Sequence, residues 1–237
     1  MMKHKYAFAA LAALATTFAS AATWTVTSAG DDASDRATLR GAIAAAADGD
    51  TITFDASLAG GSVMLDKTLG PLEYAGSLTI EGPASAPVTI DGGAGAVDQG
   101  IAYAGNSRTI YLIHATGTVA TTTLKNLVFT GSKTTQAVGT PDVGPAVSIL
   151  GSAVIDNCCW TNNGVARSGN FSQNDGGGCL RVVGDLTLSN STFVKNGAHG
   201  ASGNYVIGGA VCAKGANVFV TNCVFSETYG WDGSLSG

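Results

Sequence analysis

The sequence predicts an all-β fold, a right-handed parallel β-helix in which each coil of a solenoid holds three strands and a helix caps the N-terminal end. The first observation is an asparagine that recurs with spacings of 31, 33 and 32 residues, at Asn126, Asn157, Asn190 and Asn222. The second is an aromatic residue three places after each asparagine: Phe129, Trp160, Phe193 and Phe225. The third is a Gly content of 33 in 237 residues, about twice the usual share, which indicates many tight turns.

A repeat of this length is typical of solenoids, whose units bury their apolar side only by stacking on their neighbours. The apolar residues alternate with period two, and Gly, Asn and Thr are frequent, which excludes helical repeats. A propeller blade needs four long strands in each unit. The units of this chain have room for three short ones.

Each coil is expected to hold one strand at a Gly-small-apolar signal, one ending just before the asparagine and one containing the aromatic residue. The signal is "GPAV" (144–147), "GGCL" (177–180) and "GGAV" (208–211). Parallel coils lie ~4.8 Å apart. We therefore expect the aromatic rings to form an internal column, and the asparagines, which tolerate left-handed turns, to bond along a second column.

The N-terminal part predicts short strands in "TWTVTSAG" from Thr23, "TITF" (51–54), "SVML" (62–65), "SLTIEG" (77–82) and "PVTIDGG" (87–93). Between the first two, residues 34–47 predict a helix with Ser34 or Asp35 as N-cap, which would cover the N-terminal end of the solenoid. No comparable segment follows the last repeat, which ends in "WDGSLSG". Either the chain is a fragment, or something else covers that end.

Residues 1–22 predict a secretory signal peptide, followed by a β-helix domain over 23–237 whose repeat coils span 120–237. Lys3 and Lys5 precede a short apolar run, and the small residues "ASA" lie at 19–21. The alternative, a membrane span, needs ~20 apolar residues, and the apolar run is shorter than this.

Removing the signal leaves 10 Lys and Arg against 17 Asp and Glu, a formal charge of −7. We expect no nucleic-acid partner, because phosphate binding needs clustered basic residues.

The five cysteines are an odd number for an exported chain and form no CxxC or zinc-like set. Cys179 and Cys212 are expected in adjacent coils at the position of Ala146. This spacing would permit a disulfide, but the torsion it requires is rare between parallel side chains, so buried free thiols are the favoured prediction.

No catalytic, cofactor-binding or metal-binding residue is predicted. Adjacent Asp31 and Asp32 precede the helix, where acidic residues favour a helix N-terminus. The carboxylates of the repeats form no column: Asp142, Asp156, Asp175, Asp185 and Glu227. An alternative is a sugar-acid site with Arg181 and Lys195 as binding groups and His199 as a base, but no partner at matching spacing supports it. "NDGGG" (174–178) lacks the repeated calcium pattern. The sequons at Asn170 and Asn190 match by chance.

The stretches between coils, 131–143, 164–176 and 197–207, are expected to project as a ledge. Its residues most suited to contacts are Arg167, Asn170, Phe171, His199 and Tyr205.

Two sets of motifs resemble known surface proteins. "TLRGAIAAAADGDTITFDASLAGGSVML" (38–65) and "LTIEGP" (78–83) resemble the N-terminal entry of large bacterial surface β-helix proteins. "GGAV", "FVKN" (193–196) and "FSQN" (171–174) resemble the GGA-[apolar] and F-x-x-N signals of polymorphic outer-membrane proteins, which are autotransporter-type adhesins.

The resemblance implies a secreted or cell-surface adhesion module, attached to the outer membrane through a region beyond this chain. The partners it implies are host or neighbouring cell surfaces, or glycans. It implies no enzyme activity and no cofactor. Two alternatives stay open: a polysaccharide lyase or hydrolase of the pectate-lyase-like type, and a structural spacer. The oligomeric state is open as well.

Overall fold

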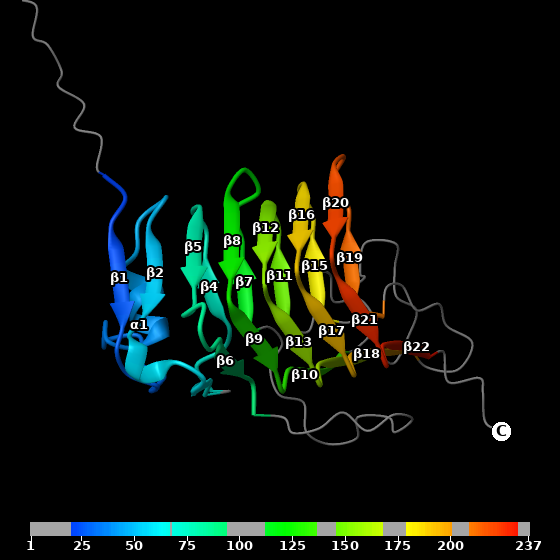
Figure 1. Cartoon of the computed structure of the whole chain (residues 1–237), viewed down its shortest axis with the longest axis horizontal. Helices are drawn as coiled ribbons and strands as arrows, with labels where there is room; N and C mark the ends of the chain where they lie inside the picture. The colour runs from blue at the N-terminus through cyan, green and yellow to red at the C-terminus, as the bar shows by residue number, and fades with distance from the viewer. Residues whose placement is uncertain are drawn as a thin grey trace, which may run out of the picture.

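The computed structural model describes residues 20–66, 68–93, 112–136, 146–167, 179–200 and 209–231. Most of the predicted signal peptide lies outside these residues. The described chain coils into a parallel β-helix, with strands of successive coils side by side along its length (Figure 1). Each coil passes through sheets that we name C, A and B in turn, and the later coils continue into a fourth sheet, D.

Sheet A contains β1 (Thr23–Val26), β2 (Thr51–Phe54), β5 (Leu78–Glu81), β8 (Thr121–Lys125), β12 (Ser152–Asp156), β16 (Leu186–Ser189) and β20 (Val218–Thr221). Sheet B contains β3 (Ser62–Met64), β6 (Val88–Asp91), β9 (Leu127–Thr130), β13 (Cys159–Thr161), β17 (Thr192–Val194) and β21 (Val224–Ser226). Sheet C contains β4 (Leu72–Tyr74), β7 (Ile113–Ala115), β11 (Val147–Ile149), β15 (Leu180–Val182) and β19 (Val211–Ala213). Sheet D contains β10 (Lys133–Gln136), β14 (Gly164–Arg167), β18 (Gly197–Gly200) and β22 (Tyr229–Trp231).

The three strands expected in each coil are present, and the strands predicted near the N-terminus are confirmed. Sheet D was not predicted. Its strands β10, β14 and β18 occupy the first residues of the three stretches that were expected to form a ledge of loops. The rest of the ledge, including Asn170, Phe171 and Tyr205, lies outside the described residues.

The aromatic column is confirmed. Phe129, Trp160 and Phe193 are fully buried and stack with ring centroids 5.0 and 4.7 Å apart, and Phe225 continues the stack at 4.8 Å. The rings are paired in register through sheet B. A residue-by-residue repeat of the backbone therefore places like side chains directly above one another.

The asparagine column is confirmed as well. All four asparagines lie in the left-handed region, with φ between 49° and 54°. The side-chain amide of Asn157 donates to Oδ1 of Asn126 at 2.8 Å, and that of Asn222 donates to Oδ1 of Asn190 at 2.6 Å. Asn190 instead donates to Oδ1 of Asp156 at 2.7 Å. These turns join sheet A to sheet B in each coil.

A second asparagine ladder, at the turn from sheet B to sheet D, was not predicted. Asn163 and Asn196 are fully buried three residues after Trp160 and Phe193. Their side-chain amides donate to the backbone oxygens of Phe129 (2.9 Å) and Trp160 (2.8 Å), one coil before. The F-x-x-N signal in "FVKN" therefore describes an inward asparagine that satisfies the backbone of a buried turn.

Helix α1 (Leu39–Ala45) caps the N-terminal end, where it contacts β1, β2 and β4 (Figure 1). It is shorter than predicted, and Thr38, not Ser34 or Asp35, is its N-cap: the Thr38 hydroxyl accepts from the backbone N–H of Gly41 at 3.1 Å. Asp32 and Asp35 instead accept from backbone N–H groups two residues on, which forms turns before the helix. A short 3₁₀ helix, η1 (Ala56–Leu58), follows β2.

The C-terminal coil has no cover among the described residues. Its inward side chain Val220 is 46% exposed, whereas Leu188, its partner one coil earlier, is fully buried. Phe225, at the end of the aromatic column, is 47% exposed. Among the described residues, the N-terminal end of the solenoid is therefore covered by α1, whereas the inward side chains of the last coil are partly exposed.

Candidate functional site

The outer face of sheet A carries a row of threonines. Strand pairing aligns one outward residue from each strand: Thr23, Thr51, Thr79, Thr123, Val154, Thr187 and Phe219. We call this set the threonine row. All its members are exposed or half-buried, and none carries a charge. The hydroxyls of Thr23, Thr51, Thr79 and Thr123 therefore follow one another at the strand spacing of about 4.8 Å, and Val154 and Phe219 interrupt the series further along the molecule.

A second row runs beside it, two residues further along each strand: Thr25, Thr53, Glu81, Lys125, Asp156, Ser189 and Thr221. Its charges alternate, with Lys125 Nζ 4.0 Å from the Glu81 carboxylate. The Ser189 hydroxyl donates to Asp156 at 2.6 Å, and this bond, with that from Asn190, lowers the pKa of Asp156. The face thus presents hydroxyls and three charged groups, in which one lysine lies between two carboxylates.

The outer face of sheet C brings together different chemical groups. One outward residue per strand stands in register: Glu73, His114, Ser148, Arg181 and Cys212. We call this set the sheet C column. Nδ1 of His114 lies 3.5 Å from Oε2 of Glu73. A carboxylate, an imidazole and a hydroxyl on successive strands are the groups of an acid–base–nucleophile arrangement.

The geometry of the column does not complete such a site. Ser148 is fully buried, and its Oγ has no hydrogen-bond partner among the described residues, so it is not bonded to His114. Arg181, the next residue of the column, is only 4% exposed. Nucleophilic catalysis needs the hydroxyl within hydrogen-bond reach of its base and open to substrate. The column can bind through Glu73 and His114, which are the more exposed members.

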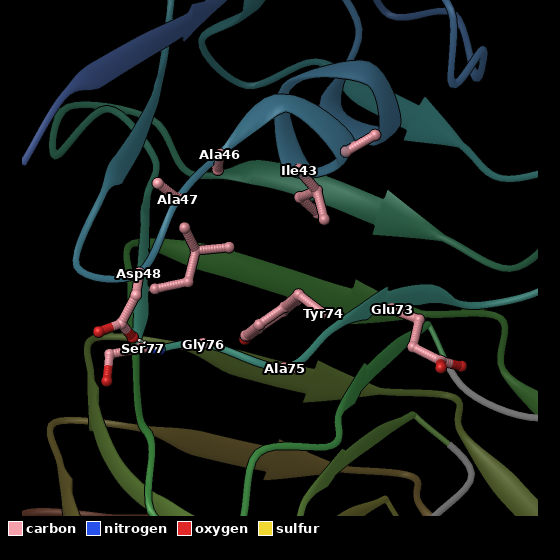
Figure 2. Close-up of a pocket in the computed structure, with 11 residues that line it drawn as sticks. Ile43, Ala46, Ala47, Asp48, Glu73, Tyr74, Ala75, Gly76 and Ser77 are labelled. Carbon is pink, nitrogen blue, oxygen red and sulfur yellow. Dashed lines mark hydrogen bonds between the residues drawn. The ribbon is translucent and has the colours of Figure 1, made fainter.

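A cleft of about 330 Å³ lies between α1 and β4. Figure 2 shows Asp48 and Ser77 at one end, Glu73 at the other and Tyr74 between them. Asp48 accepts from the backbone N–H of Ser77 at 2.6 Å, and the Tyr74 hydroxyl donates to the Thr122 hydroxyl at 3.2 Å. Burial raises the pKa of Tyr74. The polar groups of the cleft are thus engaged in structural bonds, and Glu73 is its link to the sheet C column.

The structure does not bring together the residues of the alternative sugar-acid site, Arg181, Lys195 and His199. Arg181 is on β15 in sheet C, Lys195 lies in the turn after β17, and His199 is on β18 in sheet D. Lys195 Nζ lies 3.9 Å from Glu227 in the next coil, in an exposed pair. Glu73, His114 and Ser148, which the structure does align, were missed because no shared spacing connects them.

The adjacent acidic residues before α1 are structural. Asp31 binds Arg40 through two bonds of 2.7 and 2.9 Å, and Arg40 also donates to the backbone oxygens of Gly70 and Pro71. Asp32 accepts from the backbone and hydroxyl of Ser34, which lowers its pKa. The prediction that these acidic residues favour the N-terminus of the helix is in part wrong. Asp32 fixes a turn before the helix, and Asp31, through Arg40, holds the helix to the chain near β4.

All five cysteines are free, as predicted, but only Cys158 and Cys179 are buried, so the expectation of buried thiols is wrong for the other three. The expectation that Cys179 and Cys212 share the position of Ala146 is wrong for Cys212. Cys179 is aligned with Ala146 and Ala210 and lies in the core, whereas Cys212 is aligned with the outward Arg181. Burial raises the pKa of Cys158 to about 12 and that of Cys179 well above its ordinary value. These buried thiols are poor nucleophiles.

Within the described ranges, no group of three or more His, Cys, Asp or Glu side chains could hold a metal ion. The "NDGGG" turn and the sequon at Asn170 lie outside them. No helix in the described part of the chain has the length and hydropathy needed to cross a bilayer. No protein-family model, curated protein or solved structure matches this chain.

Proposed function

We propose that this chain is a secreted or cell-surface β-helix module that adheres to glycans or to a neighbouring cell surface without catalysing a reaction. The observation that carries the proposal is the threonine row on the seven-stranded sheet A. The resemblance of the sequence to the passengers of autotransporter-type adhesins supports the same function.

The threonine row suits a polar, uncharged ligand such as a glycan. Each hydroxyl both donates and accepts hydrogen bonds, and removing a hydroxyl from water costs less free energy than removing a charged group. The strands fix the backbone, so little conformational entropy is lost when a ligand binds. Threonine is also common in strands because of its high β-propensity, whether or not a ligand binds. The experiment must therefore separate binding from folding.

The test uses the exported chain, immobilised glycans and whole cells. The double variant Thr79→Lys/Thr123→Glu places an ion pair across adjacent strands of the row, which preserves the sheet. We expect binding to fall at least about tenfold, equivalent to about 1.4 kcal/mol. The control variant Thr192→Glu changes the outer face of sheet B and should bind normally. Equal binding by the double variant and the wild type would refute the proposal, and a chain that binds neither glycans nor cells would favour the spacer.

A hydrolase is the second candidate, and the sheet C column is the observation in its favour. Glu73 and His114 lie 3.5 Å apart on adjacent strands and supply a carboxylate and an imidazole, groups that can act as general acid and base. Its test is turnover of polysaccharides, including pectin, alginate and glycosaminoglycans. Activity in the wild type that Glu73→Gln and His114→Gln both abolish would reverse the ranking of the two candidates.

A further inference from the structure

We infer that export processing cuts the chain between Ala21 and Ala22, and that the new α-ammonium group of Ala22 forms an ion pair with Asp50. The inference rests on the export that is part of the proposed function. It assigns both the processing site and the role of a carboxylate that the adhesion site does not use.

The sequence allows two adjacent cuts at the end of the predicted signal peptide, next to β1. Signal peptidase requires small residues at the first and third positions before the cut. "ASA" (19–21) meets the requirement for a cut after Ala21, and "SAA" (20–22) meets it for a cut after Ala22. Composition therefore does not choose between a mature chain that begins at Ala22 and one that begins at Thr23.

The structure distinguishes the two cuts because Ala22 is part of the fold. Its backbone N lies 2.7 Å from Oδ1 of Asp50, to which it donates. Its carbonyl accepts from the backbone N–H of Thr51 at 2.8 Å, one bond before the pairing of β1 with β2 begins. A cut after Ala22 would remove both bonds, whereas a cut after Ala21 keeps them.

Asp50 supplies the second reason. It is 4% exposed and accepts from three N–H groups: those of Ala22, the Trp24 indole (2.9 Å) and the Ala47 backbone (2.8 Å). All three donors are neutral in the uncut chain, and no side-chain cation pairs with Asp50 among the described residues. A nearly buried carboxylate is costly without a counter-charge. A cut after Ala21 turns the closest of its donors into a cation, and the bond becomes charge-assisted.

The first experiment locates the cut. The whole chain is expressed with its own N-terminus in a Gram-negative host, and the exported protein is examined by intact mass and N-terminal sequencing. A chain beginning at Ala22 is expected. A chain beginning at Thr23, or at any other residue, overturns the assigned site. An uncut chain retained in the cytoplasm contradicts export itself, and the ion pair is then decided by the second experiment alone.

The second experiment measures the ion pair in chains that begin at Ala22, released from a cleavable fusion. An α-amino group has an ordinary pKa of about 7.7–8.0, and an ion pair in the folded state raises it. The stabilisation is therefore complete below this range and is lost as the pH rises through the folded-state pKa. We expect the Tm at pH 7 to exceed that of the N-acetylated chain by about 2–4 °C, and the difference to vanish by about pH 10.

Two variants make the test specific. In Asp50→Asn, acetylation should no longer change the Tm at any pH. Asp48→Asn is the matched control, because Asp48 lies on the same turn but bonds to Ser77, and this variant should keep the full effect. The other charged groups near Asp50 are Asp48 itself and Arg36, whose guanidinium lies over the Trp24 ring at 5.4 Å. An equal Tm for the free and acetylated wild-type chains at pH 7 would overturn the ion pair, even if Asp50→Asn fails to fold.

Discussion

Oδ1 of Asn196 accepts two hydrogen bonds from Asn163, one from its backbone N–H and one from its side-chain amide, each at 3.1 Å. Both residues are fully buried, and they join two consecutive coils at the turn beyond the aromatic column. The coils of this chain are therefore held by buried amides as well as by the stacked rings and the strand pairing.

Replacing Asn196 with Ala should destabilise the fold strongly. The change removes the acceptor of two donors of Asn163 and one donor to the carbonyl of Trp160, all in the interior, and we expect a loss of about 2–4 kcal/mol in the free energy of unfolding. Urea unfolding measures the loss. Asn217→Ala is the control, since it removes an exposed amide that bonds to the exposed Asp185, and it should change stability by less than about 1 kcal/mol. Similar losses in both variants would contradict a special role for the buried ladder.

Replacing Trp160 with Phe should be nearly neutral. The Trp160 indole N–H is buried without a hydrogen-bond partner among the described residues, so removing it relieves a penalty of about 1–3 kcal/mol. The smaller ring loses a comparable amount of packing, and the net change should stay within about 1 kcal/mol. Trp160→Ala removes the ring itself and should cost about 3–5 kcal/mol. Guanidinium unfolding followed by circular dichroism compares them, and a Phe variant as unstable as the Ala variant would show that the indole has a partner.

Asp156 should make the fold sensitive to acid. Its pKa is lowered chiefly by the Ser189 hydroxyl, so its contribution is present above the ordinary carboxyl pKa and is lost as the pH falls through the lower folded-state value. Wild type should exceed Asp156→Asn in Tm at pH 6, and the difference should shrink as the pH falls below about 4. The variant Ser189→Ala should weaken this acid dependence. A difference that is constant from pH 6 to pH 2 would rule out the Asp156 carboxylate as its source.

The cysteines should divide into two groups in their reactivity. Burial raises the pKa of Cys158 to about 12, and Cys179 is also fully buried, so neither forms thiolate readily at neutral pH. In the native protein at pH 8, a thiol reagent should modify the half-buried Cys212 and Cys223 and spare Cys158 and Cys179. After unfolding, all five should react. Peptide mapping by mass spectrometry identifies the sites, and rapid native labelling of Cys158 would contradict its placement in the core.

The repeat made the core of the fold predictable. An asparagine and an aromatic ring recur every 31–33 residues, and only one arrangement of the coils stacks like residues on one another. The repeat therefore predicted the strands of sheets A and B, the aromatic column and the asparagine column between them. The short N-terminal strands were predictable for a different reason, because alternating apolar residues between glycine turns favour strands whatever lies beside them. The F-x-x-N signal was visible too, but its inward asparagine could not be inferred without the turn into sheet D.

The surface was decided by the tertiary structure. Glu73, His114 and Ser148 come together only because β4, β7 and β11 pair in register, and the connections between these strands differ in length: Leu72 and Ile113 are 41 residues apart, but Ile113 and Val147 are 34 apart. The sequence by itself determined which side chains repeat and must therefore be buried together, since burial in a solenoid follows the period. Only the folded chain decided which unlike residues meet on its outer faces and which carboxylate faces the N-terminus of Ala22, because connections of unequal length hide strand register from the sequence.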